Sequence, residues 1–229
     1  MIKLRKLLTE HFSDKRPDPS LDAFLKENKV HKFTGYLYHG SPMEGLKGML
    51  TSKIWGQEHG EIAEYSTFST SANSEILHFF SEGEGETGLS FHVKDANILV
   101  LDDIIHFLAG QLSGAGTTSD VDEEELKQFC EKYKVAHNKG WGAENYFLPY
   151  DYISSLGVDG FVFDYTWQRL RKGMVQMPRN DESEICFVSD GIDRLNNEIF
   201  SIWVDGQEFE PTQKAEAIKA IDEYVDTNV

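Results

Sequence analysis

The stretch YLYHGSPMEGL, residues 36–46, is an aromatic and apolar run that stops abruptly at His-Gly-Ser-Pro. Together with the residues before it, this run predicts a β-strand over 32–39. A strand that ends in an imidazole, a glycine and a hydroxyl suits a ligand that approaches the backbone. The same residues also suit an ordinary strand followed by a turn, which is the commoner role of an isolated His-Gly pair. The role of His39 therefore depends on which residues fold opposite it.

Outward from this strand, the hydrophobic pattern changes repeatedly between the periods of strands and helices. Further strands are expected over 66–71, 89–93, 97–103, 158–165, 182–189 and 199–206. Helices are expected over 2–12, 21–29, 43–52, 72–83, 104–112, 120–133, 143–156 and 212–225. Ser20 is a candidate N-cap for the second of these helices, and Thr118, Ser119 or Asp120 for the sixth. In the helix over 72–83 the side chains expected to face the interior are Ile76, Leu77, Phe79 and Phe80.

These elements predict an α+β protein in which a mostly helical segment separates two β-rich halves. We expect an N-terminal helical segment over 1–32, a central domain over 33–200, and a C-terminal strand and helix over 201–229. A helical insertion over 104–156 would interrupt the central domain. Long insertions often carry a function, so this one is expected to help select a partner. Its aromatic residues equally suit helices that only cover an apolar face.

The charge of the chain narrows the class of partner. Its 229 residues carry 39 acidic and 22 basic side chains, a formal net charge of -17. A surface this acidic repels phosphate groups, so direct binding to nucleic acid or to an anionic membrane is not expected. It favours a basic protein partner, or a protein that mimics nucleic acid. No apolar run approaches the roughly 20 residues that a membrane-spanning helix needs.

The remaining composition indicates a reduced compartment and no metal site. Cys130 and Cys186 are far apart in the sequence and lack metal-ligand spacing, so both are expected to be free thiols of a cytoplasmic protein. The histidines outside the strand over 32–39 form no pair at helical spacing, so no metal is expected. Residues 2–12 are amphipathic and do not resemble a signal peptide.

Three short segments place small or polar side chains at the edge of a β-prone run: LYHGS at 37–41, FSTS at 68–71 and ESEICF at 182–187. Ser-Thr-Ser before a helix is commonly N-cap chemistry. Glu182 and Glu184 share one face of a strand, because side chains alternate with a period of two. Two adjacent carboxylates repel each other, so this pair indicates a functional site.

Taken in order, the three segments resemble the signature of the ADP-ribosyltransferase superfamily. YHGS is similar to the His-Gly-Ser element of the branch that contains diphtheria toxin and the poly-ADP-ribose polymerases. FSTS and ESEICF are similar to the Ser-Thr-Ser and Glu-x-Glu elements of the other branch, which has Arg where this chain has His39. LGVDGFVFDY resembles the strand that often precedes the last motif in small bacterial and phage members. The resemblance covers roughly residues 33–200 and implies two small β-sheets that form an NAD-binding cleft.

The resemblance also implies a role for each matching residue. Glu184 would stabilise the positive charge that develops on the ribose, and Glu182 would orient or deprotonate the acceptor. Ser69 would fix the catalytic glutamate. The residues implied in binding NAD are His39, Gly40, Ser41 and Thr70. An aromatic ring would cover the nicotinamide, and the candidates are Tyr65, Phe68, Phe79 and Phe80, for which core packing is the more frequent role.

The function implied is that of an NAD-dependent mono-ADP-ribosyltransferase that modifies a protein target. Such a chain would be a toxin-like phage or bacterial effector that acts in the host cytoplasm. Two alternatives remain open at this point. One is an NAD glycohydrolase that uses the same site with water as acceptor. The other is an inactive acidic member of the fold that inhibits a basic nucleic-acid-binding protein. Because the chain combines motifs of both branches, the resemblance does not indicate which type of side chain on the target would be modified.

Overall fold

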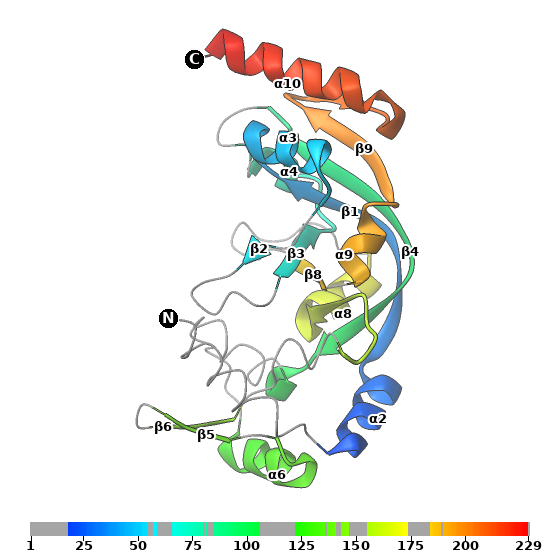
Figure 1. Cartoon of the computed structure of the whole chain (residues 1–229). Coiled ribbons are helices and arrows are strands. Elements are labelled where there is room, and N and C mark those ends of the chain that lie inside the picture. Colours follow the sequence, from blue (N-terminus) through cyan, green and yellow to red (C-terminus); the bar gives the residue numbers. More distant parts are fainter. Residues whose placement is uncertain are drawn as a thin grey trace. The chain divides into compact units, whose positions relative to one another are not determined.

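The computed structural model describes residues 18–54, 57–58, 66–79, 81, 85–105, 122–135, 137–140, 143–146, 155–173, 184–188 and 190–228 (Figure 1). One unit comprises the described residues of Met1–Val30 and Leu101–Gly157, and the other those of His31–Val100 and Val158–Val229. Both units combine helices with strands, so the mixed α and β class predicted from the sequence is confirmed. The second unit contains the main sheet and all the described residues that the sequence analysis assigns to a site.

The main sheet has eight strands, and five of them close into a small barrel. The strands are β1 (Val30–Gly40), β2 (Gln57–Glu58), β3 (Ser66–Ser71), β4 (Gly88–Leu101), β7 (Gly160–Phe163), β8 (Glu184–Val188), β9 (Ile199–Val204) and β10 (Gln207–Phe209). Their order is β1-β3-β8-β7-β4-β9-β10, with β2 on β3, and β1 also pairs with β4. The sequence predicted two small sheets at a cleft. These strands instead form a single sheet, because β1 has a partner on each of its edges.

Strand β4 is longer than its sequence pattern predicts. Two separate strands were expected over 89–93 and 97–103, and one strand spans both ranges. Asp95 adopts a positive φ of 55° in the middle of it. The hydroxyl of Thr34 on the neighbouring β1 accepts a hydrogen bond from the Asp95 amide at 2.9 Å. This cross-strand contact holds the irregular residue, so the strand continues through it.

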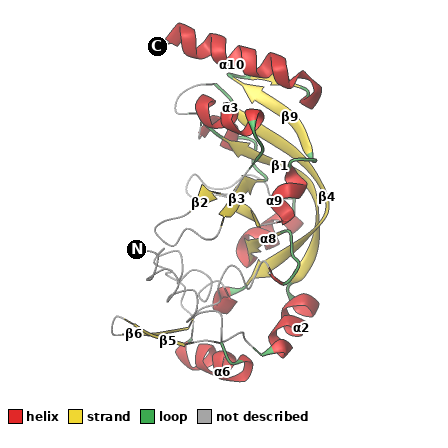
Figure 2. Cartoon of the chain, viewed as in Figure 1, coloured by secondary structure: helices red, strands yellow, loops and turns green. Residues whose placement is uncertain are grey.

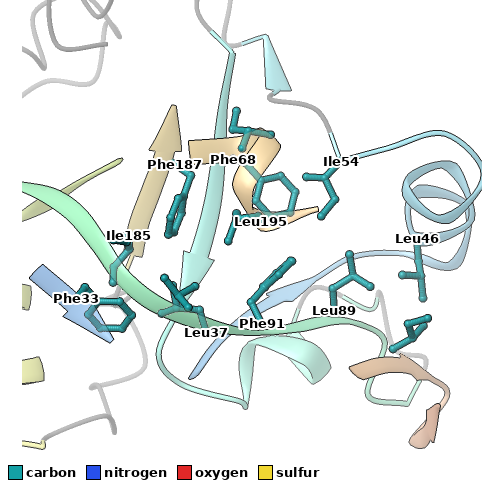
Figure 3. Close-up of a cluster of buried hydrophobic side chains, with 14 of the residues drawn as sticks. Phe33, Leu37, Leu46, Ile54, Phe68, Leu89, Phe91, Ile185, Phe187 and Leu195 are labelled. Atoms are coloured by element: carbon teal, nitrogen blue, oxygen red, sulfur yellow. The ribbon is translucent and has the colours of Figure 1, made fainter. Parts of the chain in front are cut away.

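The interior of the barrel is packed with aromatic and aliphatic side chains from distant parts of the chain (Figure 3). Phe91 and Phe187 are fully buried, and Phe68 is only 4 % exposed. The Phe68 and Phe91 rings meet edge to face, with centroids 6.0 Å apart. Aromatic contacts of this kind add to the free energy gained by burial. The inward residues of β3, β4 and β8 therefore hold the three strands in one arrangement.

Among the described residues of this unit, five α-helices and the short 3-10 helix Pro211–Gln213 follow or cover the sheet (Figure 2). The α-helices are α3 (Met43–Thr51), α4 (Ile76–Phe79), α8 (Asp164–Arg171), α9 (Asp190–Leu195) and α10 (Lys214–Asn228). An ion pair between Lys47 and Asp222 joins α3 to α10. The Asn196 side chain accepts a hydrogen bond from the Ile54 amide at 2.8 Å and so ties the chain after α3 to the end of α9.

The other unit is built around α2 (Pro19–Asn28) and α6 (Glu123–Tyr133). Phe24 of α2 packs against Tyr133 of α6, with ring centroids 5.5 Å apart. Cys130 is buried beside them, and burial raises the pKa of its thiol to about 12, so the thiol stays protonated. Strands β5 (His137–Gly140) and β6 (Ala143–Tyr146) form a separate two-stranded sheet.

Several element boundaries differ from the sequence prediction. The cap of α2 is Asp18 and not Ser20, because Pro19 occupies the first helical position and the Asp18 carboxylate accepts from the Ser20 amide. The cap of α6 is Asp122, which accepts from two amides of the first turn. It lies after Thr118, Ser119 and Asp120, the residues expected from the sequence, because the helix begins later.

Three predicted elements have the wrong type or length. The helix expected over 143–156 contains β6, whose residues pair with His137–Gly140 in a hairpin. The strand expected over 158–165 ends at Phe163, where α8 begins. The helix expected over 72–83 is only the short α4, in which Leu77 is 2 % exposed and Phe79 is 69 % exposed. The helix expected over 2–12 lies outside the described residues.

None of the helices within the described residues is long and apolar enough to cross a membrane.

The opposite exposures of Leu77 and Phe79 can be tested by truncation. Replacing Leu77 with Ala should lower the free energy of unfolding by about 2–5 kcal/mol, because it removes buried methyl groups and leaves a cavity. Replacing Phe79 with Ala should change it by no more than about 0.5 kcal/mol, as is usual at the surface. Urea unfolding of both variants measures the difference. Equal losses would contradict the orientation of α4 described here.

Candidate functional site

Three segments that are far apart in the sequence lie on adjacent strands of the barrel. Tyr38 of β1 is paired in register with Ser71 of β3, and Ser71 is paired with Glu184 of β8. Neighbouring strands are about 4.8 Å apart, so the backbones at Tyr38 and Glu184 are separated by roughly 10 Å. A ligand of the size of a nucleotide would reach all three strands. The side chain of Glu184 lies outside the described part of the structure.

The register between β3 and β8 shows which side chains of β3 lie on each face of the sheet. Phe68 is opposite Phe187 and Thr70 is opposite Ile185. These four residues are almost fully buried, so their face is turned toward the core. Directly opposed residues share a face of the sheet and successive residues alternate. The other face of β3 therefore carries Ser69 and Ser71.

His39 lies on the Phe68 face, because its neighbour Tyr38 pairs with Ser71 on the other one. Its Nδ1 lies 2.8 Å from the Ser69 carbonyl oxygen, and its ring centroid lies 4.2 Å from that of Phe68. A carbonyl can only accept, so Nδ1 must carry the hydrogen. Burial lowers the pKa of His39 below its usual value of 6.5, and the bond to Ser69 opposes part of that change. His39 is accordingly neutral near pH 7, with an acceptor lone pair at Nε2.

The hydroxyl groups of the Ser-Thr-Ser segment differ in how they are used. Thr70 donates to the Ile185 carbonyl at 2.9 Å and is buried, so its hydroxyl already stabilises the pairing of β3 with β8. Ser69 is half-buried, and its Oγ lies 3.8 Å from the Cys186 sulfur. Ser71 caps the turn that follows β3 by accepting from the Asn73 amide at 3.1 Å.

Gly40 and Ser41 end β1 in a close contact with β4. A Cβ placed on Gly88 would lie 2.0 Å from the His39 carbonyl oxygen and 3.0 Å from the Gly40 Cα. Gly88 also has a φ of +148°, so both its space and its conformation exclude a larger residue. The Ser41 amide donates to the Thr87 carbonyl at 3.2 Å. The backbone of the His-Gly-Ser segment is thus fixed by the start of β4.

Of the aromatic residues predicted to cover a nicotinamide, the structure describes Phe68 and Phe79, and these two lie apart. Phe68 is part of the core and turns toward Phe91, whereas Phe79 is exposed on α4. Tyr65 and Phe80, like Glu182, lie outside the described residues. The structure therefore brings His39, the Ser-Thr-Ser segment and the backbone of Glu184 together. Of the two described aromatic residues, Phe68 packs in the core and Phe79 lies exposed on α4, so neither is placed to cover a nicotinamide.

Tyr38 is a candidate that the sequence analysis missed. It is the residue of β1 that pairs with Ser71, which in turn pairs with Glu184. Partial burial raises the pKa of its phenol above the usual 10.0, with smaller contributions from Tyr36 and Glu208. The phenol therefore stays protonated and can donate a hydrogen bond. Nothing in the sequence pattern pointed to Tyr38, because its place beside the motifs follows from its pairing with Ser71. Alternation along β1 puts Tyr38 and His39 on different faces.

A cavity of about 320 Å³ lies elsewhere on this unit, next to α3, α9 and β9. Its lining residues are Met49, Leu50, Ser52, Lys53, Asp193, Asn196, Ile199, Ile202, Pro211 and Lys214. None of them is a site residue predicted from the sequence. Across the residues with described positions, no three His, Cys, Asp or Glu side chains are grouped so that they could hold a metal ion.

Comparison of the chain with models of protein families, with curated proteins and with solved structures finds no match.

The half-buried, neutral His39 should make stability depend on pH. Its folded pKa is below 6.5, so under acidic conditions the unfolded state binds more protons than the folded state. The free energy of unfolding should therefore fall as the pH drops below about 6.5. In the His39→Asn variant, whose amide can still donate to the Ser69 carbonyl, this part of the slope should disappear. Urea unfolding of both proteins between about pH 5 and 7.5 measures it, and identical slopes would contradict the burial of a neutral ring.

Proposed function

We propose that the chain is an NAD-dependent ADP-ribosyltransferase that modifies a protein. The supporting observation is that His39, Ser69–Ser71 and Glu184 occupy three adjacent strands, β1, β3 and β8, although about 145 residues separate the first from the last. Each of these residues lies in a motif that resembles the corresponding motif of the ADP-ribosyltransferase superfamily. A chance match of short motifs would not be expected to converge on neighbouring strands.

The proposed reaction breaks the bond between nicotinamide and its ribose. The bonding electrons leave with nicotinamide, and positive charge develops on the ribose ring as an oxocarbenium-like ion. A carboxylate fixed beside the ribose stabilises that charge. Glu184 supplies it in this proposal, and an acceptor oxygen, nitrogen or sulfur of the target then bonds to the anomeric carbon and loses its proton. Glu182 orients the acceptor or takes that proton.

His39 binds a hydroxyl of the NAD ribose in this proposal. Its Nδ1 hydrogen is committed to the Ser69 carbonyl at 2.8 Å, so Nε2 is the nitrogen left for a ligand. The lowered pKa keeps Nε2 unprotonated, which makes it an acceptor for a hydroxyl donor. An arginine at this position could only donate. In the branch that has Arg at this position, the side chain would therefore donate to the ligand, whereas His39 would accept from it.

Ser69, Ser71 and Tyr38 lie on the other face of β3 and β1 from His39, and this face is the one that Glu184 shares by its pairing with Ser71. In this proposal the ligand lies at the ends of these strands and reaches both faces. Ser69 and Ser71 share the face of β3 that is turned away from the core, and Tyr38 is opposite Ser71. The half-buried Ser69 hydroxyl and the protonated phenol provide donors for a polar ligand, whereas Ser71 is buried and caps the turn after β3. Tyr38 in this proposal donates to NAD and adds to its affinity, whereas Ser69 positions Glu184.

Replacing Glu184 with Gln should lower both transfer and NAD hydrolysis by about 100-fold or more, because the amide cannot stabilise the developing charge. Radiolabelled NAD incubated with cell lysate measures transfer, and nicotinamide release measures hydrolysis. The thermal midpoint should stay unchanged, because a carboxylate crowded by a second one does not stabilise the fold. Undiminished transfer in the folded variant would rule out the proposed role.

Replacing Glu182 with Gln separates transfer from hydrolysis. The variant should lose transfer to protein but keep part of the nicotinamide release, because Glu182 acts on the acceptor and water is a small, mobile one. The ratio of the two rates, measured in the same reaction, is the readout. Equal loss of both activities would mean that Glu182 acts on NAD and not on the acceptor.

Replacing Tyr38 with Phe removes one hydroxyl and should raise the KM for NAD about three- to ten-fold, as expected for one lost hydrogen bond. Because Tyr38 is expected to bind the ligand and not to take part in bond breaking, kcat should change less. The matched control is Tyr165→Phe on α8, which should leave both constants unaltered. A KM equal to that of the unmodified chain would remove Tyr38 from the site.

A further inference from the structure

Two large exposed side chains touch each other on the outside of the main sheet. Tyr36 of β1 is 46 % exposed and Phe200 of β9 is 49 % exposed. Their rings meet edge to face with centroids 5.1 Å apart, and His92 of β4 stacks on Tyr36 at 4.6 Å with an interplanar angle of 12°. Tyr36, His92 and Phe200 form an outer aromatic patch across three neighbouring strands.

The outward direction of these rings follows from the alternation of the strands. Leu37 and Phe91, next to Tyr36 and His92 in the chain, are fully buried and pack with residues of α3 and α9 on the inner face. Phe200 is an extra residue, because Ser90 pairs with Ser201 while Phe91 pairs with Ile199. Such a bulge reorients a side chain. In Figure 2, α3, α8 and α9 lie on one and the same side of the curved strands β1 and β4.

The patch is unlike the other exposed apolar side chains within the described residues. Phe79, Tyr165 and Val225 are also exposed, but each lies on a different helix, α4, α8 or α10. Single exposed apolar residues are normal, whereas adjoining ones mark interaction surfaces. Tyrosine and other aromatic residues are enriched where protein interfaces are buried. The outer aromatic patch therefore has the composition of a docking surface.

The net charge of the chain indicates which kind of molecule would bind to the outer aromatic patch. With a formal net charge of -17, two copies of the chain repel each other, and so do the chain and a nucleic acid. A cationic partner is attracted instead. Among cations, the planar guanidinium group of arginine stacks on aromatic rings, whereas the ammonium group of lysine is compact and strongly hydrated. Rings of the patch are suited to a guanidinium group.

The charged residues near the two ends of the patch would orient a bound basic segment. Glu208 is exposed on β10 and pairs with Trp203 of β9, and it is near enough to Tyr38 to influence that phenol electrostatically. At the other end, Lys94 is exposed two positions after His92. Arginine side chains would meet attraction at the Glu208 end and repulsion at the Lys94 end.

We propose that the outer aromatic patch binds an arginine-bearing segment of a basic partner protein by stacking guanidinium groups on Tyr36 and Phe200. The patch adjoins Tyr38, which is assigned to the proposed NAD site and lies two positions from Tyr36 on the same face of β1. The binding of an arginine-bearing segment does not depend on the proposed transferase activity.

The test compares two peptides of equal charge, an octamer of arginine and an octamer of lysine, each titrated into the full chain at about 150 mM salt. General attraction to the acidic surface acts on both peptides alike. Stacking of one guanidinium group should make the arginine peptide bind about two- to thirty-fold more tightly. In a Tyr36→Ala/Phe200→Ala variant this ratio should fall to near one. Tyr165→Ala, which removes an equally exposed tyrosine on α8, should keep it.

A second measurement avoids any risk that the double variant unfolds. In the unmodified chain, the imidazole NMR signals of His92 should shift saturably with the arginine peptide and much less with the lysine peptide. An arginine-to-lysine ratio that survives the double variant would overturn the proposal, as would unchanged His92 signals. Tighter binding of an oligothymidine than of the arginine peptide would also overturn it. So would a chain that is dimeric in solution and becomes monomeric in the double variant.

Discussion

The register of β3 between β1 and β8 is the constraint on which the rest of the structure depends. Because side chains alternate along a strand, a slip of one residue would turn Phe68 outward and Ser69 into the core. The contact of Phe68 with Phe91, at 6.0 Å between ring centroids, and its pairing with Phe187 oppose that slip. Thr70 adds a buried hydrogen bond to β8. The apolar face of β3 therefore fixes the positions of the polar residues on its other face.

The closure of the barrel then determines the state of His39. Strand β1 is held on one edge by β3 and on the other by β4, where Gly88 packs against the backbone of His39 and Gly40. The imidazole packs against the Phe68 ring, and its Nδ1 is bound to the Ser69 carbonyl. Packing in this region thus keeps the His39 imidazole neutral, with its hydrogen on Nδ1. The unprotonated Nε2 can then accept a hydrogen bond from a ligand.

The sequence predicted the strands around the core well, because these have strong local patterns. STFSTS, IFSIWV and the run ending at His39 all form strands, and β1, β3 and β8, which carry the three motifs, are neighbours in the sheet. Closure into one sheet could not be predicted, because it depends on the pairing of β1 with β3 along one edge and with β4 along the other. The exposure of Phe79 and the bulge at Phe200 also depend on tertiary packing and not on local periodicity. Tyr38 was missed for the same reason, because its importance comes from its partner on β3.

The most direct test of the account is an NMR titration of the full chain with NAD, observed at the imidazole of His39. Assignment uses the His39→Asn variant, in which those signals disappear. If His39, Ser69–Ser71 and Glu184 surround an NAD site, the His39 signals shift saturably as NAD is added. The signals of His31, which stacks beside Trp167 near the other end of β1, stay in place. His39 signals that do not move at millimolar NAD, or that move no more than those of His31, would contradict the proposed site.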